Sequence, residues 1–182
     1  PPDTDTTGGY FVVSIHRFQN IYSEKRLGNI VAELISLSAV APVRFILHPP
    51  TEIRLRKYGL FARLAEAPGV DLSQRLPYTQ FVALIAAARA VISDGGSNQE
   101  ELSYLGVPTV LFRSRSERPD GLGANVVLRS DIGMSIADYA RSGAIDALRR
   151  PSRVEADLHP SKIVLETLTS IVTGAALDGN SA

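Results

Sequence analysis

The chain has 182 residues, 45% of them hydrophobic and 21% charged, which is the composition of a globular protein with a sizeable core. Its 19 basic residues balance 19 acidic ones, which argues against nucleic acid or an anionic membrane as a partner. The absence of cysteine excludes disulfides, thiol catalysis and cysteine-ligated metals. No apolar run approaches the roughly 18–20 residues that span a bilayer and no signal peptide is visible, so we expect a cytoplasmic protein.

Strand-like and helix-like segments alternate along the chain. Runs of β-branched and aromatic residues predict strands, and apolar residues at helical spacing predict helices. Residues 1–7 are polar and proline-bearing, so we expect a linker there and a chain that begins within a longer protein. The expected elements, in chain order, are a strand at 10–15, a helix at 23–39, a strand at 43–47, a helix at 51–65, a strand at 70–72, a helix beginning at 77, a strand at 90–93, a helix at 98–105, strands at 109–112 and 126–128, helices at 136–148 and 161–172, and a frayed end at 174–182.

This alternation predicts an α/β fold: a Rossmann-like parallel sheet with helices on both faces, forming one domain over residues 8–182. In such sheets, ligands bind outside the carboxyl ends of the strands. Polar clusters that directly follow predicted strands should therefore meet at one edge of the sheet. These clusters are His16-Arg17, His48-Pro49, Asp94-Gly95-Gly96 and Arg113-Ser114-Arg115.

The most informative segment is Ser93-Asp94-Gly95-Gly96-Ser97-Asn98-Gln99-Glu100-Glu101, a glycine turn between a predicted strand and helix. Small residues let the backbone approach a phosphate, and the N-terminus of the following helix attracts anions. Ser97 and Glu100 also fit a capping box, a purely structural role that is as well supported as ligand binding. That role leaves Glu101 unexplained, so we expect Glu101 to contact a ligand, such as the hydroxyls of a ribose.

Two histidines follow predicted strands. His16 is placed to act as a general acid or to stabilise a departing phosphate, because imidazole titrates near neutrality. Position alone nevertheless favours a partly exposed histidine beside a surface arginine, Arg17. His48 precedes two prolines that stiffen the backbone, and it either touches a ligand or hydrogen-bonds a loop carbonyl.

A basic loop and an aromatic segment are further candidates. Arg113, Arg115 and Arg118 follow a predicted strand, and guanidinium groups suit diphosphates, although charged loops are more often merely solvated. Tyr78 and Phe81 could place a ring against a flat base, but the helical spacing of Phe81 favours core packing. No metal-binding spacing, nucleophile elbow or P-loop is present, and the histidines at 16, 48 and 159 are too scattered to indicate a metal site.

Taken in order, these landmarks resemble the C-terminal half of the UDP-N-acetylglucosamine 2-epimerase family, within the two-domain GT-B superfamily. The resemblance covers roughly residues 8–128 and depends on His16-Arg17-Phe18-Gln19-Asn20, His48-Pro49, Leu76-Pro77-Tyr78 with Phe81, the glycine turn, and Arg113-Ser114-Arg115-Ser116-Glu117-Arg118. Phe18 and Gln19 replace the arginine and glutamate that are common in the family. The turn reads Asp-Gly-Gly-Ser where Asp-Ser-Gly-Gly is commoner.

The resemblance implies a UDP-sugar site between two Rossmann-like domains, of which this chain is the one that holds UDP. By this analogy His16 is the catalytic residue, which faces the diphosphate and assists its departure. Glu101 takes the ribose hydroxyls, and Gly95, Gly96 and Ser97 hold the diphosphate. The remaining implied UDP contacts are Arg17, His48, Tyr78, Phe81, Arg113 and Arg118.

The family reaction is anti elimination of UDP to a 2-acetamidoglucal, followed by re-addition with C2 inverted, and it requires no cofactor or metal. The family's acid/base carboxylates belong to the N-terminal domain, so we expect this fragment to be inactive alone. The implied partners are a UDP-sugar, the N-terminal domain of the same polypeptide and, at full length, a second copy in a homodimer. We expect a role in surface polysaccharide synthesis; the alternatives are a GT-B glycosyltransferase, a hydrolysing epimerase-like enzyme and a non-catalytic nucleotide-sugar sensor.

Overall fold

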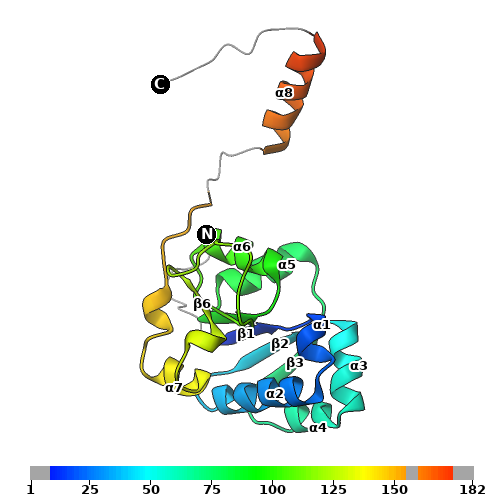
Figure 1. Cartoon of the computed structure of the whole chain (residues 1–182), viewed down its shortest axis with the longest axis vertical. Coiled ribbons are helices and arrows are strands. Elements are labelled where there is room, and N and C mark those ends of the chain that lie inside the picture. Colours follow the sequence, from blue (N-terminus) through cyan, green and yellow to red (C-terminus); the bar gives the residue numbers. More distant parts are fainter. Residues whose placement is uncertain (1–8, 155–159, 174–182) are drawn as a thin grey trace.

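A six-stranded parallel sheet forms the centre of the molecule (Figure 1). The computed structural model describes residues 9–154 and 160–173. The strands lie in the order β3-β2-β1-β4-β5-β6, and every neighbouring pair is parallel. Their bounds are β1 Phe11–Ser14, β2 Val43–Leu47, β3 Val70–Gln74, β4 Ala90–Ser93, β5 Thr109–Leu111 and β6 Val126–Leu128.

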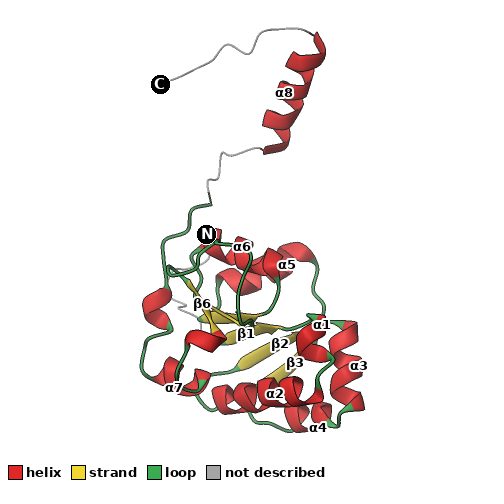
Figure 2. Cartoon of the chain, viewed as in Figure 1, coloured by secondary structure: helices red, strands yellow, loops and turns green. Residues whose placement is uncertain are grey.

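Helices cover both faces of this sheet, with α5 and α6 on one face and α2, α4 and α7 on the other (Figures 1 and 2). The predicted α/β class and parallel sheet are therefore confirmed. The helices are α1 Phe18–Ile21, α2 Glu24–Ser38, α3 Pro49–Lys57, α4 Leu60–Ala65, α5 Tyr78–Ala86, α6 Gly96–Leu105, α7 Ile136–Arg141 and α8 Pro160–Thr173, with short 3-10 helices at Arg129–Asp131 and Asp146–Leu148.

The central strand β1 is buried on both faces. Successive side chains of a strand point to opposite faces, so Phe11 and Val13 join the larger core cluster, under α2. Val12 joins the smaller cluster on the opposite face, with Ile85 of α5 and Leu102 of α6. All five side chains are 0% exposed. Packing on both faces fixes the position of β1, and β4 is paired with it, so the residues that follow these two strands start from fixed positions.

The chain reverses its direction of travel across the sheet between β1 and β4. After β1 it builds β2 and β3 on one side, and then returns to place β4 on the other side of β1. The crossover connections therefore diverge at the carboxyl ends of β1 and β4 and leave a crevice there. In open α/β sheets this crevice is the usual ligand position.

Left-handed glycines divide two predicted helices. Gly59, with φ +67°, ends α3 and begins α4, so the helix predicted at 51–65 is two helices. Gly143, with φ +78°, ends the helix predicted at 136–148 soon after α7. The four-residue helix α1 was not predicted, because one turn is too short to show an apolar period.

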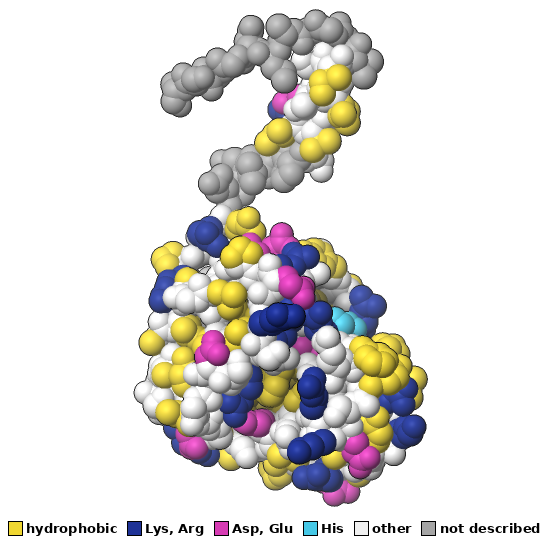
Figure 3. All heavy atoms as spheres, in the orientation of Figure 1, with side chains coloured by type: hydrophobic (Ala, Val, Ile, Leu, Met, Phe, Trp, Pro, Cys, Tyr) yellow, Lys and Arg dark blue, Asp and Glu magenta, His cyan; other side chains and the backbone are white. Residues whose placement is uncertain are grey.

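The helix predicted at 161–172 is present as α8. Its apolar side chains belong to neither hydrophobic cluster and are between 52% and 67% exposed; they are Ile163, Val164, Leu165, Leu168 and Ile171 (Figure 3). The linker predicted at 1–7 and the frayed end predicted at 174–182 lie outside the described residues. Among the described residues, no helix is both long and apolar enough to cross a membrane.

Candidate functional site

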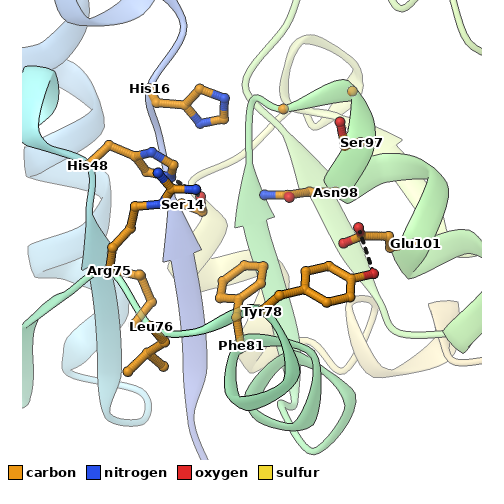
Figure 4. A pocket seen from close by; sticks show the side chains of 13 residues that line it. Ser14, His16, His48, Arg75, Leu76, Tyr78, Phe81, Ser97, Asn98 and Glu101 are labelled. Carbon is orange, nitrogen blue, oxygen red and sulfur yellow. Dashed lines mark hydrogen bonds between the residues drawn. The ribbon is translucent and has the colours of Figure 1, made fainter.

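A cavity of about 290 Å³ opens at the carboxyl edge of the sheet, above the point where β1 and β4 lie side by side (Figure 4). Strand ends and loops form one wall, and the beginnings of α5 and α6 form the other. The lining residues are Ser14, His16, Ile46, His48, Arg75, Leu76, Tyr78, Phe81, Gly95, Gly96, Ser97, Asn98 and Glu101. Seven of the predicted site residues therefore lie together with His16 around one space.

The carboxylate of Asp94, just after β4, fixes the loop that carries His16. Its two oxygens accept the backbone N–H groups of His16 at 3.0 Å and Arg17 at 2.9 Å. The side-chain amide of Asn20 donates to the same carboxylate at 2.9 Å and to the carbonyl of Phe112 at 3.1 Å. Asp94 is 0% exposed, so these donors supply the hydrogen bonds that water would make to an exposed carboxylate. It thus ties the ends of β1, β4 and β5 together.

Two imidazole rings form the wall of the cavity beyond β1 and β2. The rings of His16 and His48 stack, with centroids 4.5 Å apart and planes inclined at 26°. Nδ1 of His16 lies 3.5 Å from Oδ1 of Asp94, and Nε2 of His48 lies 3.4 Å from the Ser14 hydroxyl. Burial, followed by the charges of His16 and Arg75, lowers the pKa of His48. His48 therefore favours its neutral form at neutral pH.

The glycine turn passes close to this wall. A Cβ at Gly95 would lie 3.0 Å from Cε1 of His16, so the absence of a side chain is what admits the ring. The hydroxyl of Ser93 accepts the Gly95 N–H and the Asn98 amide, each at 3.1 Å, which holds the turn in place.

The predicted capping box does not form. Helix α6 begins at Gly96 after Gly95, and no side chain caps it. The first N–H groups of a helix lack intrahelical acceptors, and here the helix begins at the cavity. The start of α6 is therefore available to an anion, and Ser97 lies within its first turn.

The two successive carboxylates of α6 point to different places. Glu101 lines the cavity and accepts the Tyr78 hydroxyl at 3.2 Å, which joins α6 to the start of α5 (Figure 4). Glu100 forms an ion pair with Arg118 outside the cavity. Neighbouring residues on a helix are rotated by about 100°, so only one of the two can face the cavity. The negative charge of Glu101 also raises the pKa of Tyr78.

An apolar floor completes the cavity. Phe81 packs with the smaller core cluster and also lines the cavity. The sequence offered core packing and contact with a flat base as alternatives, and the position of Phe81 is compatible with both. Leu76 and Ile46 lie beside it. A flat apolar group would fit this floor, because aromatic and aliphatic side chains stack on planar rings without needing polar partners.

Three predicted arginines do not line this cavity. Arg17 and Arg113 line a second cavity of about 670 Å³, which Arg26, Arg115 and Arg129 also line. A Cβ at Gly96 would lie 3.1 Å from Nε of Arg118, and Arg113 donates to the carbonyl of Asp94 at 2.9 Å. Arg113 and Arg118 therefore lie against the glycine turn, since both belong to the loop that follows β5.

Sequence reasoning missed four residues of this region: Ser14, Arg75, Asn98 and the positioning amide of Asn20. Arg75 lines the cavity, and among the described residues its guanidinium has neither an ion-pair nor a hydrogen-bond partner. Its position directly after β3 was the available signal. Within the same described part of the chain, no three potential metal-ligating side chains lie together.

Comparison with known proteins identifies the family. The family described as UDP-N-acetylglucosamine 2-epimerase matches residues 2–149. The UDP-N-acetylglucosamine 2-epimerase of Methanocaldococcus jannaschii is 31% identical over 123 residues, which are 65% of this chain and 34% of that protein. A relative of the same description from Methanococcus maripaludis is 31% identical over 118 residues, covering 64% and 32%.

A solved structure agrees. The M. jannaschii UDP-GlcNAc 2-epimerase in complex with UDP-GlcNAc and UDP superimposes with a TM-score of 0.72 at 25% identity, covering 88% of this chain and 45% of that one. This chain thus spans less than half the length of the relatives it matches, and its sheet corresponds to one half of their fold. Because the family match includes most of the chain, this protein belongs to the UDP-N-acetylglucosamine 2-epimerase family.

Proposed function

We propose that this chain is the UDP-binding C-terminal half of a non-hydrolysing UDP-N-acetylglucosamine 2-epimerase. The observation that carries the proposal is the polarity of the 290 Å³ cavity. His16, His48, Arg75 and the N-terminus of α6 surround one end, where a diphosphate would be stabilised. Glu101 lies apart from these cations, where a carboxylate would accept ribose hydroxyls, and the apolar floor of Phe81, Leu76 and Ile46 would hold uracil on the far side of the ribose.

In the proposed reaction, a proton leaves C2 of the sugar as the bond between C1 and the UDP oxygen breaks. The electron pair of the C2–H bond forms the C1=C2 double bond, and UDP carries away the pair of the broken bond. UDP then adds back to C1 while a proton returns to the opposite face of C2. The acid/base groups for C2 belong, in this proposal, to the other half of the enzyme.

The residues of this chain would act on the leaving group. The N–H groups at the start of α6 and the cations at that end would stabilise the charge that develops on the diphosphate. His16 would face the bridging oxygen and assist the departure of UDP. Asp94 holds the backbone of His16 in place, so little rearrangement would be needed as the bond breaks.

Calorimetric titration of the chain with UDP tests this proposal. We expect UDP to bind more tightly than UMP, because UMP lacks the second phosphate, and more tightly than ADP, because the proposal assigns the floor to uracil, which is smaller than adenine. Glu101→Gln should weaken UDP binding by about 1–3 kcal/mol, since a hydrogen bond to a charged acceptor is lost.

Glu100→Gln is the matched control, because it makes the same change one residue away on the side of α6 that faces Arg118. UDP affinity should be unchanged in that variant. Tighter binding of ADP than of UDP would contradict the uridine assignment, and equal effects of the two substitutions would remove Glu101 from the site.

A further inference from the structure

The hydrogen bond between Tyr78 and Glu101 joins two helices across the mouth of the cavity. Tyr78 is the first residue of α5, and Glu101 lies in the second turn of α6. The phenol oxygen donates to Oε1 of Glu101 at 3.2 Å, and both side chains line the same space (Figure 4). The Tyr78 side chain is 65% exposed, so core packing does not explain its position.

The Glu101 carboxylate has no other partner within residues 9–154 and 160–173. Glu100, beside it, is neutralised by Arg118 and points away from the cavity. A carboxylate offers about four lone-pair sites, and the phenol occupies one of them. The remaining sites can accept two neighbouring hydroxyl groups at once, which is the geometry of the 2′,3′-diol of a ribose.

Without the phenol, Glu101 would be free to rotate. A glutamate on a helix surface samples many rotamers, and fixing one of them costs conformational entropy on binding. The Tyr78 hydroxyl supplies that restraint in advance. Pro77, at the N-cap of α5, restricts the backbone that carries the ring. The contact therefore holds the carboxylate in one orientation.

We propose that Tyr78 is the positioning residue that makes this cavity selective for ribonucleotides over 2′-deoxyribonucleotides, by holding the Glu101 carboxylate toward the sugar diol. The inference rests on the proposed function, because it requires a uridine nucleotide in the cavity. Beyond that function, the inference assigns the selectivity for ribose over 2′-deoxyribose to the hydroxyl group of Tyr78.

The test is a titration of the whole chain with UDP and with 2′-deoxy-UDP. We expect the unmodified chain to bind UDP about tenfold more tightly than 2′-deoxy-UDP, as for the loss of one hydrogen bond to a charged group. Tyr78→Phe, which removes only the hydroxyl, should weaken UDP binding about fivefold and leave 2′-deoxy-UDP binding within about twofold. The ratio of the two dissociation constants should thus fall from about ten to about two.

Tyr104→Phe is the matched control, since Tyr104 is an exposed tyrosine on α6, the helix that carries Glu101, and does not line the cavity. It should keep the tenfold ratio, and thermal unfolding should show that both variants are folded. A folded Tyr78→Phe variant that keeps the ratio would overturn the inference alone, as would an unmodified chain that binds the two nucleotides equally. An unmodified chain that binds no UDP would overturn the proposed function as well.

Discussion

The carboxylate of Asp94 places His16 by two contacts: Oδ1 accepts the backbone N–H of His16 at 3.0 Å and lies 3.5 Å from Nδ1 of the same residue. His16, which follows β1, is therefore held in place by a residue that follows the neighbouring strand β4. The stability of the fold and the placement of the site residue therefore depend on one buried group.

We expect Asp94→Asn to reduce the free energy of unfolding by roughly 1–3 kcal/mol. An asparagine turns one acceptor oxygen into a donor that faces the N–H groups of His16 or Arg17, and an unsatisfied buried donor costs about 1–3 kcal/mol. Urea unfolding measures the change. Asp71→Asn, at an exposed aspartate of β3, is the control and should stay within about 0.5 kcal/mol. Equal effects of the two substitutions would contradict the role of Asp94.

Stability should fall in mild acid through His48. Its pKa is lowered from the ordinary value of 6.5, first by burial and then by the charges of His16 and Arg75. The unfolded chain therefore binds a proton at His48 more readily than the folded chain does. This contribution to stability is complete above about pH 6.5 and is lost as the pH falls toward the pKa in the folded state. Thermal unfolding between about pH 7.5 and 5 should show a smaller loss in His48→Gln than in the unmodified chain. A loss of the same size in both would refute this assignment.

The end of α6 should be intolerant of any side chain. Gly106 has φ +68°, and a Cβ there would lie 2.1 Å from the carbonyl oxygen of Arg150. Gly106→Ala should therefore cost more than about 3 kcal/mol of stability, since both backbone strain and a clash with the main chain are imposed. Gly123 has φ +74°, and a Cβ there would meet no neighbouring group within 4 Å, so a substitution at this position imposes backbone strain without a clash. Gly123→Ala should cost about 1–2 kcal/mol in chemical denaturation. Similar costs at the two positions would show that the clash is relieved.

In an enzyme that contains this chain together with the rest of the relatives' length, His16→Ala should lower kcat about 100-fold or more, with KM changed less than about threefold. The reason is that His16 is proposed to assist the departure of UDP and not to hold the ground state. Conversion of UDP-N-acetylglucosamine followed by NMR gives both constants. An unchanged kcat with a raised KM would instead make His16 a binding residue.

Much of the site was predictable from local pattern. Alternating strand and helix periods predicted the parallel sheet, and the placement of polar residues after strands predicted that His16, His48 and the glycine turn would meet. The distinction between Glu100 and Glu101 also came from local reasoning, although its basis was partly wrong. The helical rotation between neighbouring residues turns Glu100 away from the cavity, where it pairs with Arg118, and the expected capping box is absent.

The amino-acid sequence by itself determined all six strands and most of the longer helices, because side-chain periodicity and backbone preference act over a few residues. Only the tertiary structure decided that β1 lies beside β4, since strand order depends on contacts between distant segments. That order brings Asp94 to His16 and stacks His16 on His48. It also places Arg17 and Arg113 at a second cavity. Which side of a turn an arginine occupies depends on the path of the whole chain around the sheet, and this path cannot be predicted from the residues next to the arginine.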